Sequence, residues 1–151
     1  MSASLLFLDF DGTLHPEPCY RDEDLFCRRP LFEAVIREAP DVEIVITSTW
    51  RDTRDLATLR GFFSNDIAAR VIGVTPSWRD LPELAEEIGP TYVRQIEIEG
   101  WLRQQNRVWE SWIALDDKAH WFRPFLPNLV LCDAKTGLCE RSAAELRRRL
   151  R

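Results

Sequence analysis

Two aspartates separated by one residue end an apolar run near the start of the chain, within the segment Leu5 to Leu14. In an extended segment, residues two apart project to the same side, so Asp9 and Asp11 can face one ligand while Phe10 points into the core. Neighbouring carboxylates repel one another, and a divalent metal is the usual remedy. Gly12 lets the backbone turn sharply and lets a ligand approach closely. This segment therefore predicts a site for a cation or a phosphate.

Polar residues with related chemistry follow other apolar segments or open a helical pattern. They are Thr47, Ser48, Arg94, Asp116 and Asp117. Each has an ordinary explanation, because a hydroxyl or a carboxylate often caps a turn or a helix and an exposed arginine is often solvated. Together with Asp9 and Asp11, however, they supply what phosphoryl transfer requires: a nucleophile, cations, hydrogen-bond donors and a proton donor.

The acidic groups predict a magnesium site. Mg²⁺ prefers oxygen ligands and keeps several waters, so Asp9, the backbone carbonyl of Asp11 and Asp116 are its predicted protein ligands. Asp117 is predicted to be a further ligand or to orient the others.

The other groups are predicted to handle the phosphate. Thr47 or Ser48 and nearby backbone N–H groups can hold its oxygens, and Arg94 can neutralise its charge. A carboxylate nucleophile splits hydrolysis into two in-line displacements. Asp11 can protonate the leaving group in the first and deprotonate water in the second.

These residues can meet only if their segments form one sheet. Apolar runs alternate with helical patterns, which is typical of a parallel sheet with crossover helices. The predicted strands cover residues 5–10, 42–46, 71–74, 112–115 and 129–132. The predicted helices cover residues 30–39, 52–63 and 93–105, a short helix within 75–89, and a last helix opened by a capping box of Ser142 and Glu145. We predict a three-layer, Rossmann-like α/β fold with a central parallel five-stranded sheet, in which ligands gather beyond the carboxyl ends of the strands.

The composition fits one domain over residues 1–151, since 45% of the 151 residues are hydrophobic. No run approaches the roughly 18 apolar residues of a membrane span, and the N-terminal apolar run lacks the flanks of a signal peptide. We therefore expect a soluble, cytoplasmic protein without an obligate protein partner. The net charge of -5 argues against a broad surface for duplex nucleic acid.

The four cysteines form no CxxC pair, so reduced thiols are expected. A metal site of His15 and His120 with Cys19 or Cys27 is disfavoured, because the spacing matches no standard zinc pattern.

Several of the six tryptophans lie close to an arginine: Trp50-Arg51, Trp78-Arg79 and, two apart, Trp121 and Arg123. Trp50 and Arg51 closely follow Thr47, so we predict that they stand at the mouth of the site and recognise the substrate beyond its phosphate. An indole can stack on a base. Packing at a helix start, with a solvated guanidinium, is the alternative for this pair.

The segment Asp9-Phe10-Asp11-Gly12-Thr13-Leu14 resembles the first motif of the haloacid dehalogenase (HAD) superfamily of phosphohydrolases. The resemblance implies that Asp9 is the nucleophile that becomes aspartyl-phosphate. It also implies that Asp11 is the general acid and base.

The other superfamily motifs have counterparts in the same order. Thr47 stands where the second motif has Ser or Thr, and Asp116-Asp117 stands where the fourth motif lies. The third motif is normally lysine. Arg94 is the best candidate for it, a departure shared by polynucleotide-end phosphatases of the superfamily, and Lys118 is the competing choice.

A narrower resemblance covers nearly the whole chain. The matching strings are Leu8-Asp9-Phe10-Asp11-Gly12 with His15-Pro16, Ile46-Thr47-Ser48-Thr49-Trp50-Arg51, Gly73-Val74-Thr75-Pro76, Glu97-Ile98 with Trp101-Leu102, and Ala114-Leu115-Asp116-Asp117. They resemble the HAD domain of Swiss Army Knife RNA repair proteins. This resemblance implies a nucleic-acid end phosphatase, with RNA or DNA ends as substrate.

The gaps between the motifs are too short for a full cap domain, so we expect an open site. An open site suits a large substrate, such as an oligonucleotide end or a phosphoprotein, whose own bulk closes it. The prediction is thus a Mg²⁺-dependent phosphatase. The alternatives are a phosphatase of nucleotides or other small esters, and a catalytically idle domain that binds phosphate or a protein.

Overall fold

Five short parallel strands form the central sheet, in the spatial order β3-β2-β1-β4-β5. The computed structural model describes residues 3–150. The strands are β1 (Leu5–Leu8), β2 (Glu43–Ile46), β3 (Val71–Val74), β4 (Trp112–Asp116) and β5 (Leu129–Leu131). All four residues of β1 are buried apolar residues, as expected for a central strand of a parallel sheet that is covered on both faces.

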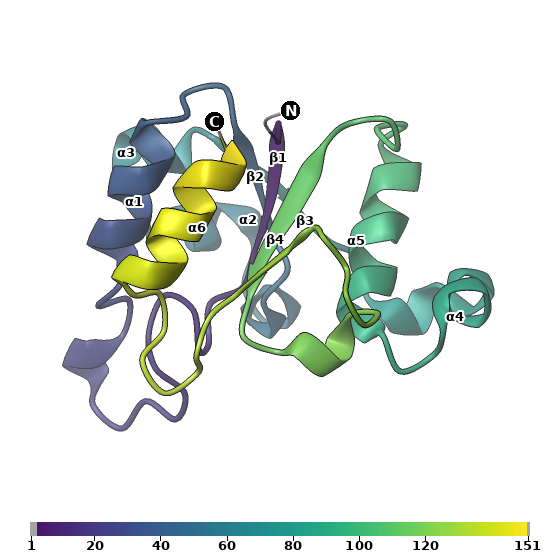
Figure 1. The fold of residues 1–151 in the computed structure, drawn as a ribbon, viewed down its shortest axis with the longest axis horizontal. Coiled ribbons are helices and arrows are strands. Elements are labelled where there is room, and N and C mark those ends of the chain that lie inside the picture. Colours follow the sequence, from purple (N-terminus) through teal and green to yellow (C-terminus); the bar gives the residue numbers. More distant parts are fainter. Residues whose placement is uncertain (1–2, 151) are drawn as a thin grey trace.

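Helices cover both faces of this sheet (Figure 1). One face carries α1 (Arg29–Arg37), α2 (Leu56–Arg60), α3 (Asn65–Ala68) and α6 (Glu140–Leu150). The other carries α5 (Val93–Gln104), and α4 (Pro82–Ile88) packs against the outer side of α5. Four short 3-10 turns complete the described chain: η1 (Asp22–Asp24), η2 (Thr49–Asp52), η3 (Trp78–Asp80) and η4 (Ala119–Trp121). The predicted three-layer α/β fold is confirmed.

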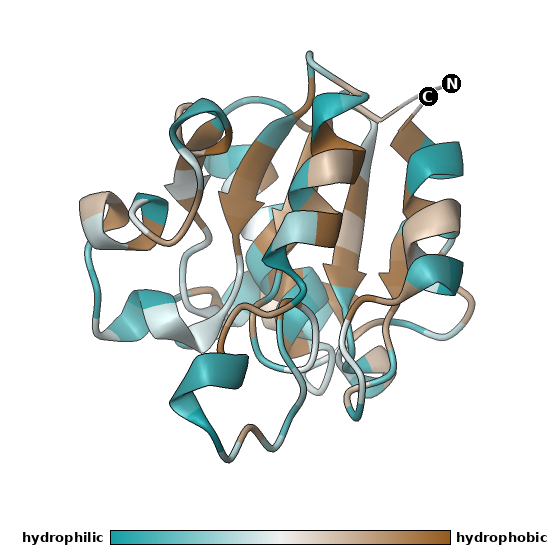
Figure 2. Cartoon of the chain, turned by 90° about the vertical axis from the view of Figure 1, so that its left-hand side faces the viewer, coloured by the Kyte–Doolittle hydropathy of each residue, from teal (hydrophilic) through white to brown (hydrophobic). Residues whose placement is uncertain are grey.

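Each face of the sheet has its own apolar core. Because side chains alternate along a strand, Leu6 and Leu8 pack in the core that α1 and α6 cover, whereas Leu5 and Phe7 pack in the core that α5 covers. Phe7 also meets Trp101 of α5 edge to face, with 5.6 Å between the ring centroids. Figure 2 shows the result: the apolar strands lie between layers of helices, and the outer surface of these helices is largely hydrophilic.

The five predicted strands are confirmed, but the predicted helix over residues 52–63 is too long, since only α2 within it is an α-helix. Asp52 ends the turn η2, and α2 begins after Asp55, whose side chain accepts a hydrogen bond of 2.8 Å from the Thr58 N–H. Asp55 is therefore the N-cap, because it offers an acceptor to the unpaired N–H groups of the first turn. After α2, a separate short helix, α3, begins at Asn65.

The last helix begins earlier than the predicted capping box implies. It starts at Glu140, and the hydroxyl of Ser142 reaches back to accept a 3.0 Å hydrogen bond from the Cys139 N–H. Ser142 thus plays the third-residue part of a capping box and not the N-cap part.

The connections between strands hold only the helices and turns named above. Within residues 3–150, none of them forms a separate cap domain over the carboxyl ends of the strands. None of the helices in this part of the chain is both long and apolar enough to cross a membrane.

Candidate active site

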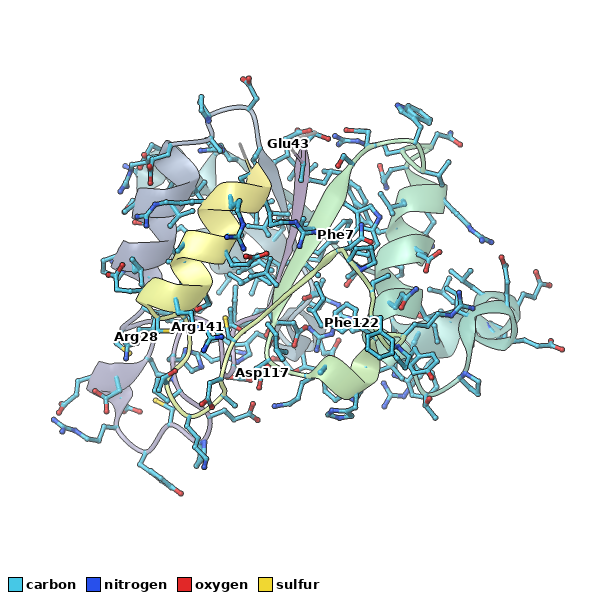
Figure 3. All side chains as sticks on the ribbon, in the orientation of Figure 1. Phe7, Arg28, Glu43, Asp117, Phe122 and Arg141 are labelled. Carbon is cyan, nitrogen blue, oxygen red and sulfur yellow. The ribbon has the colours of Figure 1, made fainter. Side chains whose placement is uncertain are left out.

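The strand register brings three predicted site residues to one edge of the sheet. Leu8 of β1 is paired with Ile46 of β2 and Leu115 of β4, so the next residues, Asp9, Thr47 and Asp116, end neighbouring strands together. All three are buried. Figure 3 shows Asp117 at this end of the sheet, opposite the end where Glu43 begins β2.

Arg94 is the cation in contact with this group. It lies in the first turn of α5 and is 3% exposed. Its Nη1 donates to Asp9 Oδ1 at 3.2 Å and to Thr47 Oγ1 at 2.9 Å, and lies 3.5 Å from Asp116 Oδ2. Its Nε is buried and has no hydrogen-bond acceptor among the described residues. That Nε lies 3.8 Å from Glu97 Oε1, so a further carboxylate faces the guanidinium on this side. Arg94 therefore neutralises part of the acidic cluster.

Three carboxylates form a compact cluster. One oxygen from each of Asp9, Asp116 and Asp117 lies within 4.8 Å of the others. Burial, and then the charge of Asp116, raise the pKa of Asp9 well above its ordinary value, and burial raises the pKa of Asp116 to about 6. Asp117 Oδ1 is buried and accepts no hydrogen bond from residues 3–150. Crowded carboxylates with an unused oxygen fit the oxygen ligands that Mg²⁺ prefers.

The loop after β1 packs directly against this cluster at Gly12. Gly12 has a φ of 77°, and a Cβ built on it would lie 2.3 Å from Asp117 Oδ2. A larger residue would therefore meet both a strained backbone conformation and a clash with the carboxylate. Glycine is required here because the loop and the acidic pair touch.

The side chain of Asp11 lies outside the carboxylate cluster, so only its backbone carbonyl remains as the predicted metal ligand. Its Oδ1 accepts a 2.8 Å hydrogen bond from His15 Nε2, and Trp50 Nε1 lies 3.1 and 3.2 Å from its two oxygens. The Phe26 N–H donates to His15 Nδ1 at 3.3 Å, which leaves the hydrogen on Nε2. The hydrogen bond from His15, helped by that from Trp50, lowers the pKa of Asp11.

Trp50 and His15 thus have places that the sequence did not indicate. Trp50 was predicted at the mouth of the site. It is half-buried and its indole N–H is bonded to Asp11. His15 was considered as a ligand beside cysteines and as part of the narrower resemblance, but not as a partner of Asp11. All four cysteines of the chain, which lie within the described residues, are free thiols.

Arg51 does not stand at the mouth of the site, contrary to the prediction. Its side chain is 5% exposed and its donors reach the protein itself: Nη1 bonds the carbonyl of Thr47 at 2.6 Å, Nε bonds that of Thr75 at 2.9 Å, and Nη2 bonds Glu97 Oε2 at 2.7 Å. Arg51 therefore ties the ends of β2 and β3 to α5. Glu97 was not among the predicted site residues, although it belongs to one of the strings that carry the narrower resemblance.

Two further predicted residues, Ser48 and Lys118, make contacts that separate them from Asp9. The hydroxyl of Ser48 accepts from the Trp50 N–H at 3.3 Å and so caps η2, which leaves Thr47 as the hydroxyl beside Arg94. Lys118 Nζ lies 2.6 Å from Asp117 Oδ2 and 2.7 Å from Glu17 Oε2. Of these two cations it is Arg94 that contacts Asp9.

A parallel sheet whose first and fourth strands end in aspartates, with a hydroxyl and a buried cation beside them, defines a phosphohydrolase-type domain of the HAD superfamily. A family model described as the HAD domain in Swiss Army Knife RNA repair proteins matches residues 5–143, and the chain belongs to this family. Membership supports HAD-type phosphatase activity in general. No curated protein and no solved structure matches the chain.

The crowded carboxylates predict how stability responds to pH and metal. The folded state binds the Asp116 proton more tightly than the unfolded chain does, so metal-free protein should lose stability as the pH rises from about 4 through 6. Mg²⁺ should reverse the loss, since a ligand that binds only the folded state stabilises it. Thermal unfolding at several pH values, with and without Mg²⁺, measures both effects.

The matched variants are Asp116→Asn and Glu86→Gln, the second removing an exposed acid of α4. Asp116→Asn should flatten the pH dependence and abolish the shift with Mg²⁺, whereas Glu86→Gln should change neither. An equal Mg²⁺ shift in both variants would place the ion outside this cluster.

Proposed function

We propose that this protein is a Mg²⁺-dependent phosphatase that forms an aspartyl-phosphate on Asp9, and that it acts on the phosphorylated ends of nucleic acids. The observation that carries the proposal is the convergence of Asp9, Thr47 and Arg94 at one strand edge. The family match supports the same class of reaction.

The first displacement joins the phosphate to the protein. Thr47 and Arg94 hold the phosphate oxygens, and a carboxylate oxygen of Asp9 attacks the phosphorus in line with the leaving oxygen. The bond to the leaving oxygen breaks as Asp11 gives that oxygen a proton. A phosphate dianion beside Asp11 favours its protonated form, which offsets the hydrogen bonds that lower its pKa.

The second displacement frees the phosphate. Asp11, now a carboxylate, takes a proton from water as the water oxygen attacks the phosphorus. The bond between phosphorus and Asp9 breaks, so inorganic phosphate leaves and both aspartates return to their starting states. His15 and Trp50 keep the Asp11 carboxylate in one orientation through both steps, which serves a group that must meet two different oxygens.

Asp9, Asp116 and Asp117, with the backbone carbonyl of Asp11, would hold Mg²⁺. When bound, the ion supplies positive charge against the phosphate oxygens, which lowers the repulsion between phosphate and carboxylate nucleophile.

The substrate assignment depends on access to the site. The described residues contain no cap domain over the strand ends, and such a site can admit the end of a long chain. The free thiols fit a reducing compartment such as the cytoplasm.

Turnover of an aryl phosphate and of phosphorylated oligonucleotides, each with Mg²⁺ and with a chelator, tests the proposal. Release of phosphate should require Mg²⁺ and should be faster from oligonucleotides than from sugar phosphates. Binding of phosphate without any turnover would instead indicate a catalytically idle domain. Faster turnover of small sugar phosphates would indicate a small-molecule phosphatase.

Arg94→Ala should lower the rate about 10² to 10³ fold, because it removes a preorganised charge from the phosphate. Lys118→Ala should cost less, since Lys118 contacts Asp117 and Glu17 and not Asp9. Steady-state rates at saturating Mg²⁺ compare the two variants. A large loss in Lys118→Ala alone would transfer the role of phosphate cation to Lys118 and leave the reaction class intact.

A further inference from the structure

A cavity of ≈ 260 Å³ opens beside Arg94, and its lining residues do not include Asp11 or His15. The turns η2, η3 and η4 and the first turn of α5 form its walls. Figure 3 shows η4, which ends just before the labelled Phe122, next to α5 at the end of the molecule that holds Asp117. The cavity is thus part of the same sheet edge as the carboxylates.

Arg94 connects this cavity to the reacting groups. Its side chain lines the cavity and also bonds Asp9 and Thr47. Its Nε is buried and lacks an acceptor among residues 3–150. An anionic group held by Arg94 would therefore have the rest of its molecule within reach of the cavity.

Two indoles line the cavity. Trp78 and Trp121 are both half-buried, so each packs partly on the core and keeps part of its surface for the cavity. The guanidinium of Arg94 lies over the ring of Trp121, 5.1 Å from its centroid, and that of Arg79 lies over the ring of Trp78, 4.8 Å from its centroid. A base that enters would therefore join an arginine and an indole that already stack on one another. Aromatic rings beside arginines are the groups on which nucleic-acid bases stack.

The walls are held in place by buried ionic contacts. Glu97 Oε2 accepts from the Trp78 N–H at 3.1 Å and from Arg51 Nη2 at 2.7 Å, and Arg51 Nη2 also donates to the carbonyl of Pro76 at 3.3 Å. These contacts fix η3 to α5 and to η2. A cavity fixed in this way loses little conformational freedom when a ligand enters.

We propose that this cavity binds the base of the nucleotide whose phosphate reaches Asp9, with Trp78 and Trp121 as the stacking surfaces. The inference rests on the proposed phosphatase function and makes it specific: the protein selects a phosphorylated nucleotide unit by its base. It also replaces Trp50, whose indole is committed to Asp11, as the aromatic group that recognises the substrate.

The test compares two trinucleotides that carry the same terminal phosphate, one with a base on the terminal sugar and one without it. Each is made in a 5′-phosphate and a 3′-phosphate form. Wild-type kcat/KM should be about 5 to 150 fold higher for the base-bearing substrate, the range that stacking of one base contributes. Trp78→Ala should reduce this ratio towards one, and Trp78→Phe should keep most of it.

Trp109→Ala is the matched control, since Trp109 is 74% exposed and lies in the loop before β4, away from the carboxyl ends of the strands. It should leave the ratio unchanged. Equal rates for base-bearing and abasic substrates in the wild type would overturn the inference, and so would a faster reaction with a phosphotyrosine peptide. Absence of turnover for every phosphate ester would instead contradict the proposed phosphatase.

A binding measurement keeps the test decisive if Trp78→Ala does not fold. In Asp9→Asn protein, the base-bearing trinucleotide should quench tryptophan fluorescence more than the abasic one does. Adding Trp78→Phe should remove part of that difference, and adding Trp109→Phe should not. The same quenching by both trinucleotides would overturn the inference. A mononucleotide that quenches as strongly as the trinucleotide would support the base site and identify free nucleotides as its ligands.

Discussion

Asp9→Asn should abolish turnover, with a loss on the order of 10⁴ fold or more, because the variant lacks the carboxylate that attacks phosphorus. The chain should still fold. Asp9 is 4% exposed and its pKa is raised by burial and by Asp116, so a neutral amide of nearly the same shape suits the position. Steady-state rates and thermal unfolding measure the two effects.

An acid quench during turnover adds a direct check on the intermediate. Wild-type protein should carry an acid-stable phosphate that hydroxylamine removes, and Asp9→Asn should carry none. The Glu86→Gln variant should behave as the wild type. Retained turnover in Asp9→Asn would exclude the aspartyl-phosphate route, even if the protein proves to be a phosphatase.

Asp11→Asn should cost roughly 10² to 10⁴ fold for substrates whose leaving oxygen needs a proton, such as a nucleoside. The loss should be smaller for an activated aryl ester, which leaves as a stable anion. The structure supports separate roles for the two aspartates, since Asp11 bonds His15 and Trp50 while Asp9 bonds Arg94. Rates for nucleoside and aryl phosphates in both aspartate variants provide the comparison.

His15 supplies a companion to that experiment. His15→Ala should show the same dependence of rate on the leaving group as Asp11→Asn, with a smaller loss of rate. This change removes the hydrogen bond that orients the Asp11 carboxylate but leaves the carboxylate itself in place. His15→Gln, which restores an N–H donor, should recover part of the rate. Equal losses on nucleoside and aryl phosphates in Asp11→Asn would mean that Asp11 is not the proton donor.

The strands were predictable from the sequence. A strand of a parallel sheet that is buried on both faces consists almost entirely of apolar residues, as in Leu5 to Leu8, and few other elements show such a run. The bounds of the helix predicted over residues 52–63 were not predictable, because Leu56, Leu59 and Phe63 keep helical spacing although α2 ends at Arg60. What decides the outcome is the capping of α2 by Asp55, a local competition that spacing alone does not reveal.

The site residues likewise include some that were predictable from the sequence and some that were not. Asp9, Thr47 and Asp116 were predictable because each follows a buried strand, and parallel strands end at a common edge. The positions of Arg51 and His15 were not, because both depend on partners distant in sequence or on the path of a loop: Glu97 for Arg51, and the Phe26 N–H for His15. The spacing of an arginine or a histidine in the sequence does not tell whether its side chain lies at the mouth of a site or makes buried contacts.

The close contact between Gly12 and Asp117 has a consequence for variation within this fold. A Cβ at position 12 would lie 2.3 Å from Asp117 Oδ2, so the two positions cannot change independently. A related chain that replaces the glycine would have to shorten or withdraw the second acid at the end of its fourth strand, and one that lengthens this acid to glutamate would need the loop to retreat. Because the φ of 77° also disfavours any residue with a Cβ at position 12, a smaller residue at position 117 removes the clash but not the backbone strain. A library that randomises both positions should therefore still return mostly glycine at position 12.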